Sequence, residues 1–164
     1  MEGSTHFRNG RFISAVHAAG WPKRLHGLVA RVILALAELR SDVLALMGEA
    51  AESISPAPSS VIVFGSFARA EADADSDIDL VVVRPDAIDE DDADWVESLE
   101  AWRQRVRVIA GNDVEVIEAP ASEVSRKLRG RSELWRQIKK DAIVVFGAEI
   151  DALTEPAADD PARS

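Results

Sequence analysis

The chain contains no cysteine among its 164 residues. This absence excludes disulfide bonds and zinc–thiolate sites, and it is compatible with a reducing compartment. The first residues show no basic stretch followed by an apolar one, so we expect no secretory signal. Charged residues interrupt the apolar stretch from Leu25 to Met47, which excludes a membrane span there. We therefore expect a cytoplasmic protein that does not enter a membrane.

The chain also lacks an excess of basic residues, because its formal net charge is −10. Proteins that grip nucleic-acid phosphates usually present a basic face, so the overall charge disfavours a nucleic-acid partner. Basic residues nevertheless gather at 103–107 and 126–140, which keeps an RNA or an acidic protein possible as a partner. Apolar residues make up 47% of the chain, enough for a core, and the length suggests one domain with extensions.

Four segments can be separated along the chain. Residues 1–20 show no clear period and stay unassigned. Residues 21–54 form a helical segment, because Trp21-Pro22 is a typical helix start and apolar residues follow at helical spacing. Ser41-Asp42 either caps a second helix there or lies within one long helix. Residues 59–147 form the core, and the Ala-, Asp- and Pro-rich tail 152–164 is expected to be disordered.

Within the core, short apolar runs alternate with helical patterns, which predicts a small mixed sheet of about four strands. The fold class is therefore α/β (α+β), with helices mainly on one face of the sheet and a long N-terminal helix or helix pair before it. Trp95 and Trp102 recur at helical spacing and are expected in the core. The expected strands are 61–64, 78–83, 114–117 and 142–146. The expected helices are 66–70, 92–110, 122–128 and 132–139. We expect Asp92 to cap the second of these helices and Gly111 to end it, and a serine to cap each of the last two.

The most informative stretch joins a Gly-Ser turn to a pair of acids. The turn is Gly65-Ser66-Phe67-Ala68-Arg69-Ala70, and Ser76-Asp77-Ile78-Asp79 follows at the start of the next strand. Residues two apart on a strand share one face, about 6.5 Å apart along the chain. Two carboxylates beside a turn that can cradle phosphate are what a magnesium–nucleotide site requires.

Each of these residues also has a simpler interpretation. Asp77 and Asp79 could be solvated acids at the start of a strand, and Ser66 could be only a helix cap. Arg69 could reach a phosphate or pair with an acid of the following loop. The Gly-Ser turn and the Asp-x-Asp pair occurring together favour the metal and phosphate interpretations for Asp77, Asp79 and Ser66.

With these motifs the chain resembles the nucleotidyltransferase superfamily of DNA polymerase β type, and within it the minimal nucleotidyltransferase branch. The resemblance covers residues 61–118 well and extends more weakly to 146. It implies a third acid on a neighbouring strand, and the matching position is Glu115, where relatives more often carry Asp. Asp113 is the alternative third acid. Ala70 is a second departure, because glycine is usual at its position.

The resemblance implies a transferase that moves NMP, most simply AMP from ATP, to a hydroxyl of a macromolecular or small-molecule acceptor. Two Mg²⁺ ions and ATP or another NTP are the implied cofactor and substrate. A protein partner or a homodimer is expected, and the acceptor could be the toxin of a toxin–antitoxin pair. The alternative is a catalytically weak nucleotide-binding or protein-interaction module. The implied catalytic and metal residues are Asp77, Asp79 and Glu115, and the implied nucleotide-binding residues are Gly65, Ser66, Arg69 and Ser76.

Overall fold

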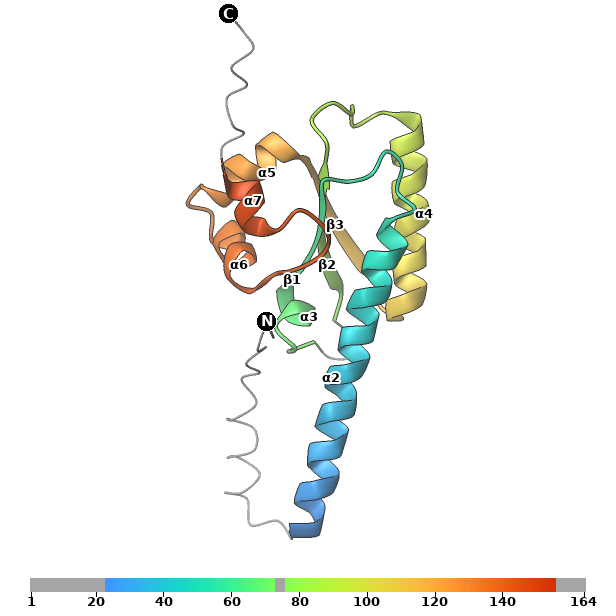
Figure 1. The fold of residues 1–164 in the computed structure, drawn as a ribbon, viewed down its shortest axis with the longest axis vertical. Helices are drawn as coiled ribbons and strands as arrows, with labels where there is room; N and C mark the ends of the chain where they lie inside the picture. Colours follow the sequence, from blue (N-terminus) through green and yellow to red (C-terminus); the bar gives the residue numbers. More distant parts are fainter. Residues whose placement is uncertain (1–22, 73–75, 156–164) are drawn as a thin grey trace, which may run out of the picture. The chain divides into compact units, whose positions relative to one another are not determined.

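The computed structural model describes residues 23–72 and 76–155, and it divides the chain after Asp42 into two units. The unassigned segment 1–20, the expected helix start at Trp21-Pro22 and residues 156–164 lie outside the described residues. One uninterrupted helix, α2, runs from Lys23 to Ala51 (Figure 1). Ser41 and Asp42 therefore lie within one long helix and do not cap a second one. Among the described residues, no helix is long and apolar enough to span a membrane.

The second unit is built on a four-stranded mixed sheet. Its strands are β1 (Ser60–Phe64), β2 (Ile78–Arg84), β3 (Val114–Pro120) and β4 (Ile143–Gly147). The strand order is β3-β2-β1-β4. Strand β1 pairs antiparallel with β2 and β4, whereas β2 and β3 are parallel. The predicted mixed sheet is confirmed, and its most apolar runs occupy the two central positions.

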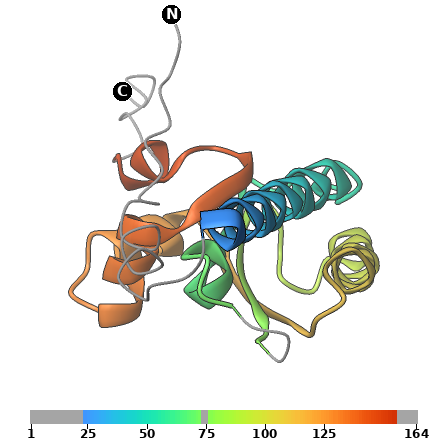
Figure 2. The same cartoon turned by 90° about the horizontal axis from the view of Figure 1, so that it is seen from below.

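Helices cover both faces of this sheet, so the expectation of helices mainly on one face is wrong. Helix α4 (Ala93–Ala110) lies on one side, and α5 (Ala121–Leu128), α6 (Glu133–Asp141) and α7 (Ile150–Thr154) lie on the other (Figures 1 and 2). Leu80 and Val82 pack in the α4 cluster, whereas Val81 and Val83 pack in the α5–α6 cluster. Because β2 is apolar at consecutive positions, it must be covered on both faces.

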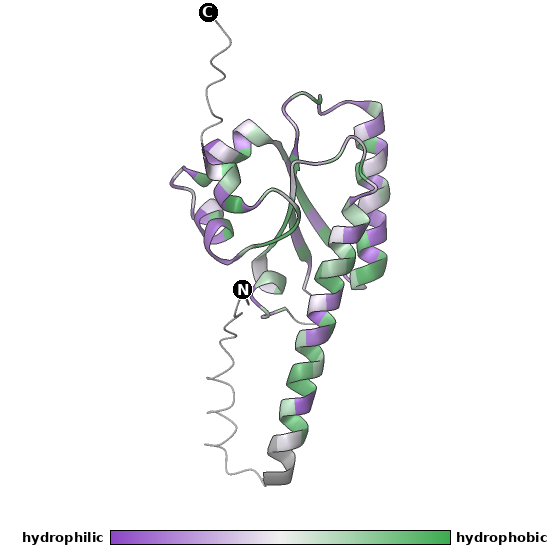
Figure 3. Cartoon of the chain, in the orientation of Figure 1, coloured by the Kyte–Doolittle hydropathy of each residue, from purple (hydrophilic) through white to green (hydrophobic). Residues whose placement is uncertain are grey.

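The last turns of α2 belong to the second unit and pack closely there. Met47 and Ala51 are fully buried with Trp102, whose indole Nε1 donates to the Met47 carbonyl at 3.4 Å. A Cβ atom on Gly48 would lie 2.2 Å from the Val145 carbonyl oxygen, so glycine permits this approach of helix to strand. Trp95 and Trp102 are both fully buried, as predicted. The strands that they help to cover are mainly hydrophobic in Figure 3.

The helix ends were predicted with mixed success. Asp92 caps α4 by accepting from the Trp95 backbone N–H at 3.0 Å, and Gly111 ends the helix at a φ of 74°. The serine cap predicted at Ser122 is wrong: Ser122 lies inside α5, where its N–H and hydroxyl both donate to Asp86. Ser132 occupies the N-cap position directly before α6, as predicted, but its side chain makes no capping hydrogen bond. The tail expected from residue 152 begins within α7.

Candidate active site

The Gly-Ser turn contacts one of the two predicted acids. Strand β1 ends at Phe64, and Gly65 opens the one-turn helix α3 (Gly65–Ala68) with a φ of 71°. A Cβ atom at Gly65 would lie 2.0 Å from the Oδ2 atom of Asp79. Glycine is needed here both for the left-handed backbone and for the approach to the carboxylate. The turn and the acid thus lie on the same side of the sheet.

The strand register brings the third acid to the same place. Asp79 of β2 lies opposite Phe64 of β1 and opposite Glu115 of β3. Paired residues of neighbouring strands point to the same face, so Asp79 and Glu115 share the face that α5, α6 and α7 cover further along. Asp77 is exposed and lies directly before β2. Residues from three strands or their ends therefore converge at one end of the sheet.

The electrostatics of Asp79 reflect this convergence. Burial raises the pKa of Asp79, the negative charges of Asp77 and Glu115 raise it further, and the positive charge of Arg69 lowers it. Within the described part of the chain, none of these three acids forms an ion pair. Several carboxylates held near one another without an ion-pair partner make a site at which a metal ion would be stabilised.

Asp113, the alternative third acid, is placed differently. Its carboxylate pairs with Arg107 of α4, and its backbone carbonyl accepts from the Ile78 N–H at 2.9 Å. It is not among the charges that shift the pKa of Asp79, whereas Glu115 is. The geometry therefore favours Glu115 over Asp113 as the acid that acts together with Asp79.

Arg69 and Ala70 follow the turn. The Arg69 Nε atom donates to Glu71 at 2.7 Å, the loop pairing that was one of its two interpretations. Its charge also acts on Asp79, so the arginine lies within electrostatic reach of the acids. Ala70 adopts a φ of 58°, a left-handed conformation that disfavours a residue with a Cβ atom. The position at which the motif resemblance leads us to expect glycine thus keeps the backbone conformation that glycine favours.

The two serines of the predicted site are half-buried, at opposite ends of the loop between β1 and β2. Ser66 lies in α3, whose four residues are too few for a substantial helix dipole, so phosphate binding would depend on local N–H and hydroxyl groups. The Ser76 carbonyl accepts from the Asn112 side-chain amide at 3.0 Å. Asn112 thereby ties the start of β3 to the residue before Asp77. Sequence reasoning missed this role, because no local pattern marked the asparagine.

The donor set fits a magnesium ion that is completed by substrate. Among the described residues, no group of three or more His, Asp or Glu side chains is arranged to hold a metal ion by itself. Magnesium, however, commonly takes one or two protein carboxylates and fills its other positions with water and substrate phosphates. Asp77 and Asp79 supply two such carboxylates, and Asp79 lies directly against the Gly-Ser turn.

Comparisons with known proteins identify the family. The nucleotidyltransferase domain family matches residues 47–155, whereas no curated protein gives a significant match. The chain is similar in structure to a toxin–antitoxin crystallised with AMP-PNP, at 19% identity and a TM-score of 0.42, covering 63% of this chain and 72% of that one. It is also similar to a minimal nucleotidyltransferase, at 25% identity and a TM-score of 0.38. The match covers 66% of this chain and 91% of that one. The family match spans more than half of the chain, which therefore belongs to the nucleotidyltransferase domain family.

Proposed function

We propose that the protein transfers a nucleoside monophosphate, most simply AMP from ATP, to a hydroxyl group of an acceptor. In this reaction the acceptor oxygen attacks the α-phosphorus, a new P–O bond forms, and the bond to the pyrophosphate leaving group breaks. One or two Mg²⁺ ions held by Asp77 and Asp79 would neutralise the triphosphate charge. The acceptor is a macromolecule or a small molecule, and the motif resemblance suggests the toxin of a toxin–antitoxin pair.

The residues of the site divide this work. Gly65 lets the turn approach the Asp79 carboxylate closely, and Ser66 would offer its hydroxyl and N–H to a phosphate bound beside the turn. Ser76 would help to position the nucleotide. Glu115, opposite Asp79 on β3, would accept the proton of the acceptor hydroxyl or hold it through a water molecule.

One observation carries the proposal most strongly. The Gly65 turn, which ends β1, touches the carboxylate of Asp79, and that carboxylate also feels the charges of Asp77 and Glu115. A glycine turn held against a carboxylate and several acids without an ion-pair partner have little structural use together. They are complementary to a cation-bridged triphosphate.

Two measurements test the proposal. Mg²⁺–ATP should raise the melting temperature of the protein, because a ligand of the folded state stabilises it. The protein should also transfer label from α-labelled ATP to a component of a total cell extract, and D77N should abolish this transfer. Absence of both the thermal shift and the transfer, with each of the four NTPs, would contradict the proposed function. A thermal shift without transfer would favour the catalytically weak nucleotide-binding module.

A protein-interaction role is supported by a separate observation on α2. Leu28, Val32, Leu34, Leu36 and Leu39 are each more than half exposed. Val29, Val32, Leu36 and Leu39 follow one another at spacings of three and four residues, the pattern of helices that pair as coiled coils. Figure 3 shows the predominance of hydrophobic residues along this part of α2. We propose that a second copy of the chain pairs through this helix.

The mass of the protein in solution tests the pairing. The native chain should be a dimer, and L36E should convert it to a monomer because a buried glutamate would oppose the helix contact. V108E is the matched control, since Val108 lies on α4 and is 84% exposed, more than any other large apolar residue in the described part of the chain. A monomeric native protein, or equal effects of the two substitutions, would contradict pairing through α2.

A further inference from the structure

A cavity of about 510 Å³ lies beside the candidate active site. Arg69 lines it on one side, and Glu133, Arg136, Gln137, Lys140 and Asp141 of α6 line it on the other. The volume is within the range of small-molecule sites. None of the α6 residues was singled out by the sequence motifs, so the cavity adds a segment of the chain to the site.

Arg69 connects this cavity to the acids. Its backbone N–H donates to the Gly65 carbonyl at 3.3 Å, and its charge acts on Asp79. The cavity therefore begins where the Gly-Ser turn ends. A ligand whose α-phosphate lies beside the turn and Asp79 would extend its remaining groups past Arg69 toward α6.

The lining of the cavity is suited to an anion. Arg69, Arg136 and Lys140 supply three positive charges, and each pairs with a neighbouring acid: Glu71, Glu133 and Asp141, respectively. These pairs are exposed, and the Lys140–Asp141 pair is long, at 3.8 Å. Exposed ion pairs of this kind contribute little free energy, so the cations are available to exchange their acid for a phosphate. Such a ligand gains charge-assisted hydrogen bonds at a small cost.

We propose that Arg136 and Lys140 of α6, together with Arg69, bind the β- and γ-phosphates of the NTP. The inference rests on the proposed function, and it names the part of the substrate that each segment holds. The Gly65 turn and the acids take the α-phosphate, and α6 takes the pyrophosphate that leaves. Release of pyrophosphate would then depend on α6 and not on the metal-binding acids alone.

The test compares binding of AMP, ADP, ATP and inorganic tripolyphosphate, each with Mg²⁺, by calorimetry. R136Q and K140Q should each weaken ATP and tripolyphosphate binding about tenfold, ADP binding less, and AMP binding not at all, because only the longer phosphate chains reach α6. K139Q is the matched control, since Lys139 lies in the same last turn of α6 but does not line the cavity. K139Q should bind all four ligands as the native protein does.

Different failures have different meanings. If R136Q and K140Q bind ATP as K139Q does, the cavity inference is overturned while the proposed function stands. Equal losses for AMP and ATP would also overturn it, because the cavity would then hold the nucleoside. If the native protein binds tripolyphosphate through α6 but transfers no label from any NTP, the anion site is supported and the proposed function fails. No binding of tripolyphosphate by the native protein would overturn the cavity inference.

Discussion

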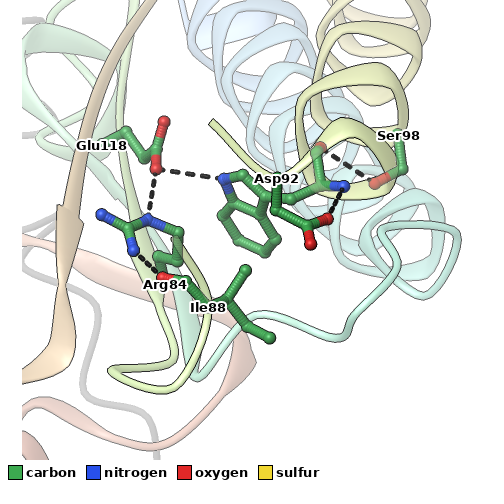
Figure 4. Close-up of polar contacts among 6 residues, drawn as sticks. Arg84, Ile88, Asp92, Ser98 and Glu118 are labelled. Atoms are coloured by element: carbon green, nitrogen blue, oxygen red, sulfur yellow. Dashed lines mark hydrogen bonds and ion pairs between the residues drawn. The ribbon is translucent and has the colours of Figure 1, made fainter. Parts of the chain in front are cut away.

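Strand β2 carries charged groups at both ends, and the two ends are organised in opposite ways. At its start, Asp79 lies near Asp77 and Glu115, and their charges raise its pKa further beyond the effect of burial. At its end, Arg84 is buried and donates through Nε to Glu118 of β3 at 2.7 Å (Figure 4). The first end gathers like charges, whereas the second pairs opposite ones.

The paired end is satisfied by several donors and acceptors. The same Glu118 oxygen accepts from the Trp95 indole N–H at 3.0 Å, and Arg84 also donates to the Ile88 carbonyl. These bonds link β2, β3, α4 and the loop between β2 and α4, so their role is structural. Figure 4 shows Arg84 and Glu118 pointing toward each other, with Ile88 beside them.

The contrast indicates which end has a functional role. A carboxylate that already has two donors has little to gain from a ligand. Carboxylates that repel one another gain from any cation that arrives, and the fold accepts their repulsion only because packing elsewhere is sufficient. The unpaired end is therefore the candidate site, even though both ends contain acids on β2 or β3.

The largest effect is expected from D79N at the unpaired end. Transfer of label should fall at least about a hundredfold, because one of the two carboxylates that we propose to hold magnesium is lost. In the absence of metal and nucleotide, however, the variant should be more stable than the native protein. D91N, in the exposed loop before α4, is the control and should change neither property. If D79N transferred label as the native protein does, the functional role assigned to the start of β2 would be contradicted.

The sign of the stability effect follows from the pKa of Asp79. The pKa of Asp79 is higher in the folded protein than in the unfolded chain, so the folded protein holds this proton more tightly. The free energy of unfolding therefore falls as the pH rises from the pKa of the unfolded chain to that of the folded protein. At higher pH the free energy of unfolding stays at this lower value. D79N removes this loss at neutral pH. Denaturant titrations at several pH values, without metal, measure the difference. If D79N were less stable than the native protein at neutral pH, the expected stabilisation would be contradicted.

The opposite result is expected from E118Q at the paired end. The amide keeps an oxygen for Trp95 but loses the charge that Arg84 requires, so the protein should lose about 2 kcal/mol of stability. Mg²⁺–ATP binding should be unchanged when it is measured well below the melting temperature. Denaturant unfolding and calorimetry provide the two readouts. Weaker nucleotide binding with unchanged stability would mean that this end, too, belongs to the site.

Two glycines with similar backbones sharpen the contrast. Gly65 and Gly111 have φ values of 71° and 74°, but only at Gly65 would a Cβ atom meet Asp79; at Gly111 nothing lies within 4 Å. G111A should lose about 1 kcal/mol of stability from backbone strain, and G65A should lose more, because its Cβ atom would also meet Asp79. G65A alone should also weaken Mg²⁺–ATP binding, by about tenfold or more. Equal nucleotide affinities for the two variants would show that close approach at Gly65 is not needed.

The smallest effect is expected at Ala70. Its left-handed φ of 58° costs roughly 1–2 kcal/mol for a residue with a Cβ atom. A70G should remove that strain while adding entropy to the unfolded chain, for a net gain of about 0.5–1 kcal/mol. Thermal unfolding measures the gain, and Mg²⁺–ATP binding should stay the same. A loss of stability would show that the turn does not carry this strain.

Several of these features could be read from local patterns. The strands of the core were predicted because their apolar runs are short and bounded by breakers, and the cap at Asp92 because it precedes an amphipathic helix. The helices on both faces were missed, although apolar residues at consecutive positions of β2 already required them. The Arg84–Glu118 pair was missed because its partners are 34 residues apart and neither belongs to a motif.

The sequence by itself determined the mixed sheet, the long α2 helix pattern, and the Gly65-Ser66 and Asp77-x-Asp79 motifs, because each depends on the spacing of residues along a single segment. Only the tertiary structure decided which acid stands opposite Asp79, since this depends on the register between β2 and β3. It also decided that α6 approaches Arg69 and lines an open cavity with it. Strand register and helix placement arise from packing between distant segments, which no local spacing encodes.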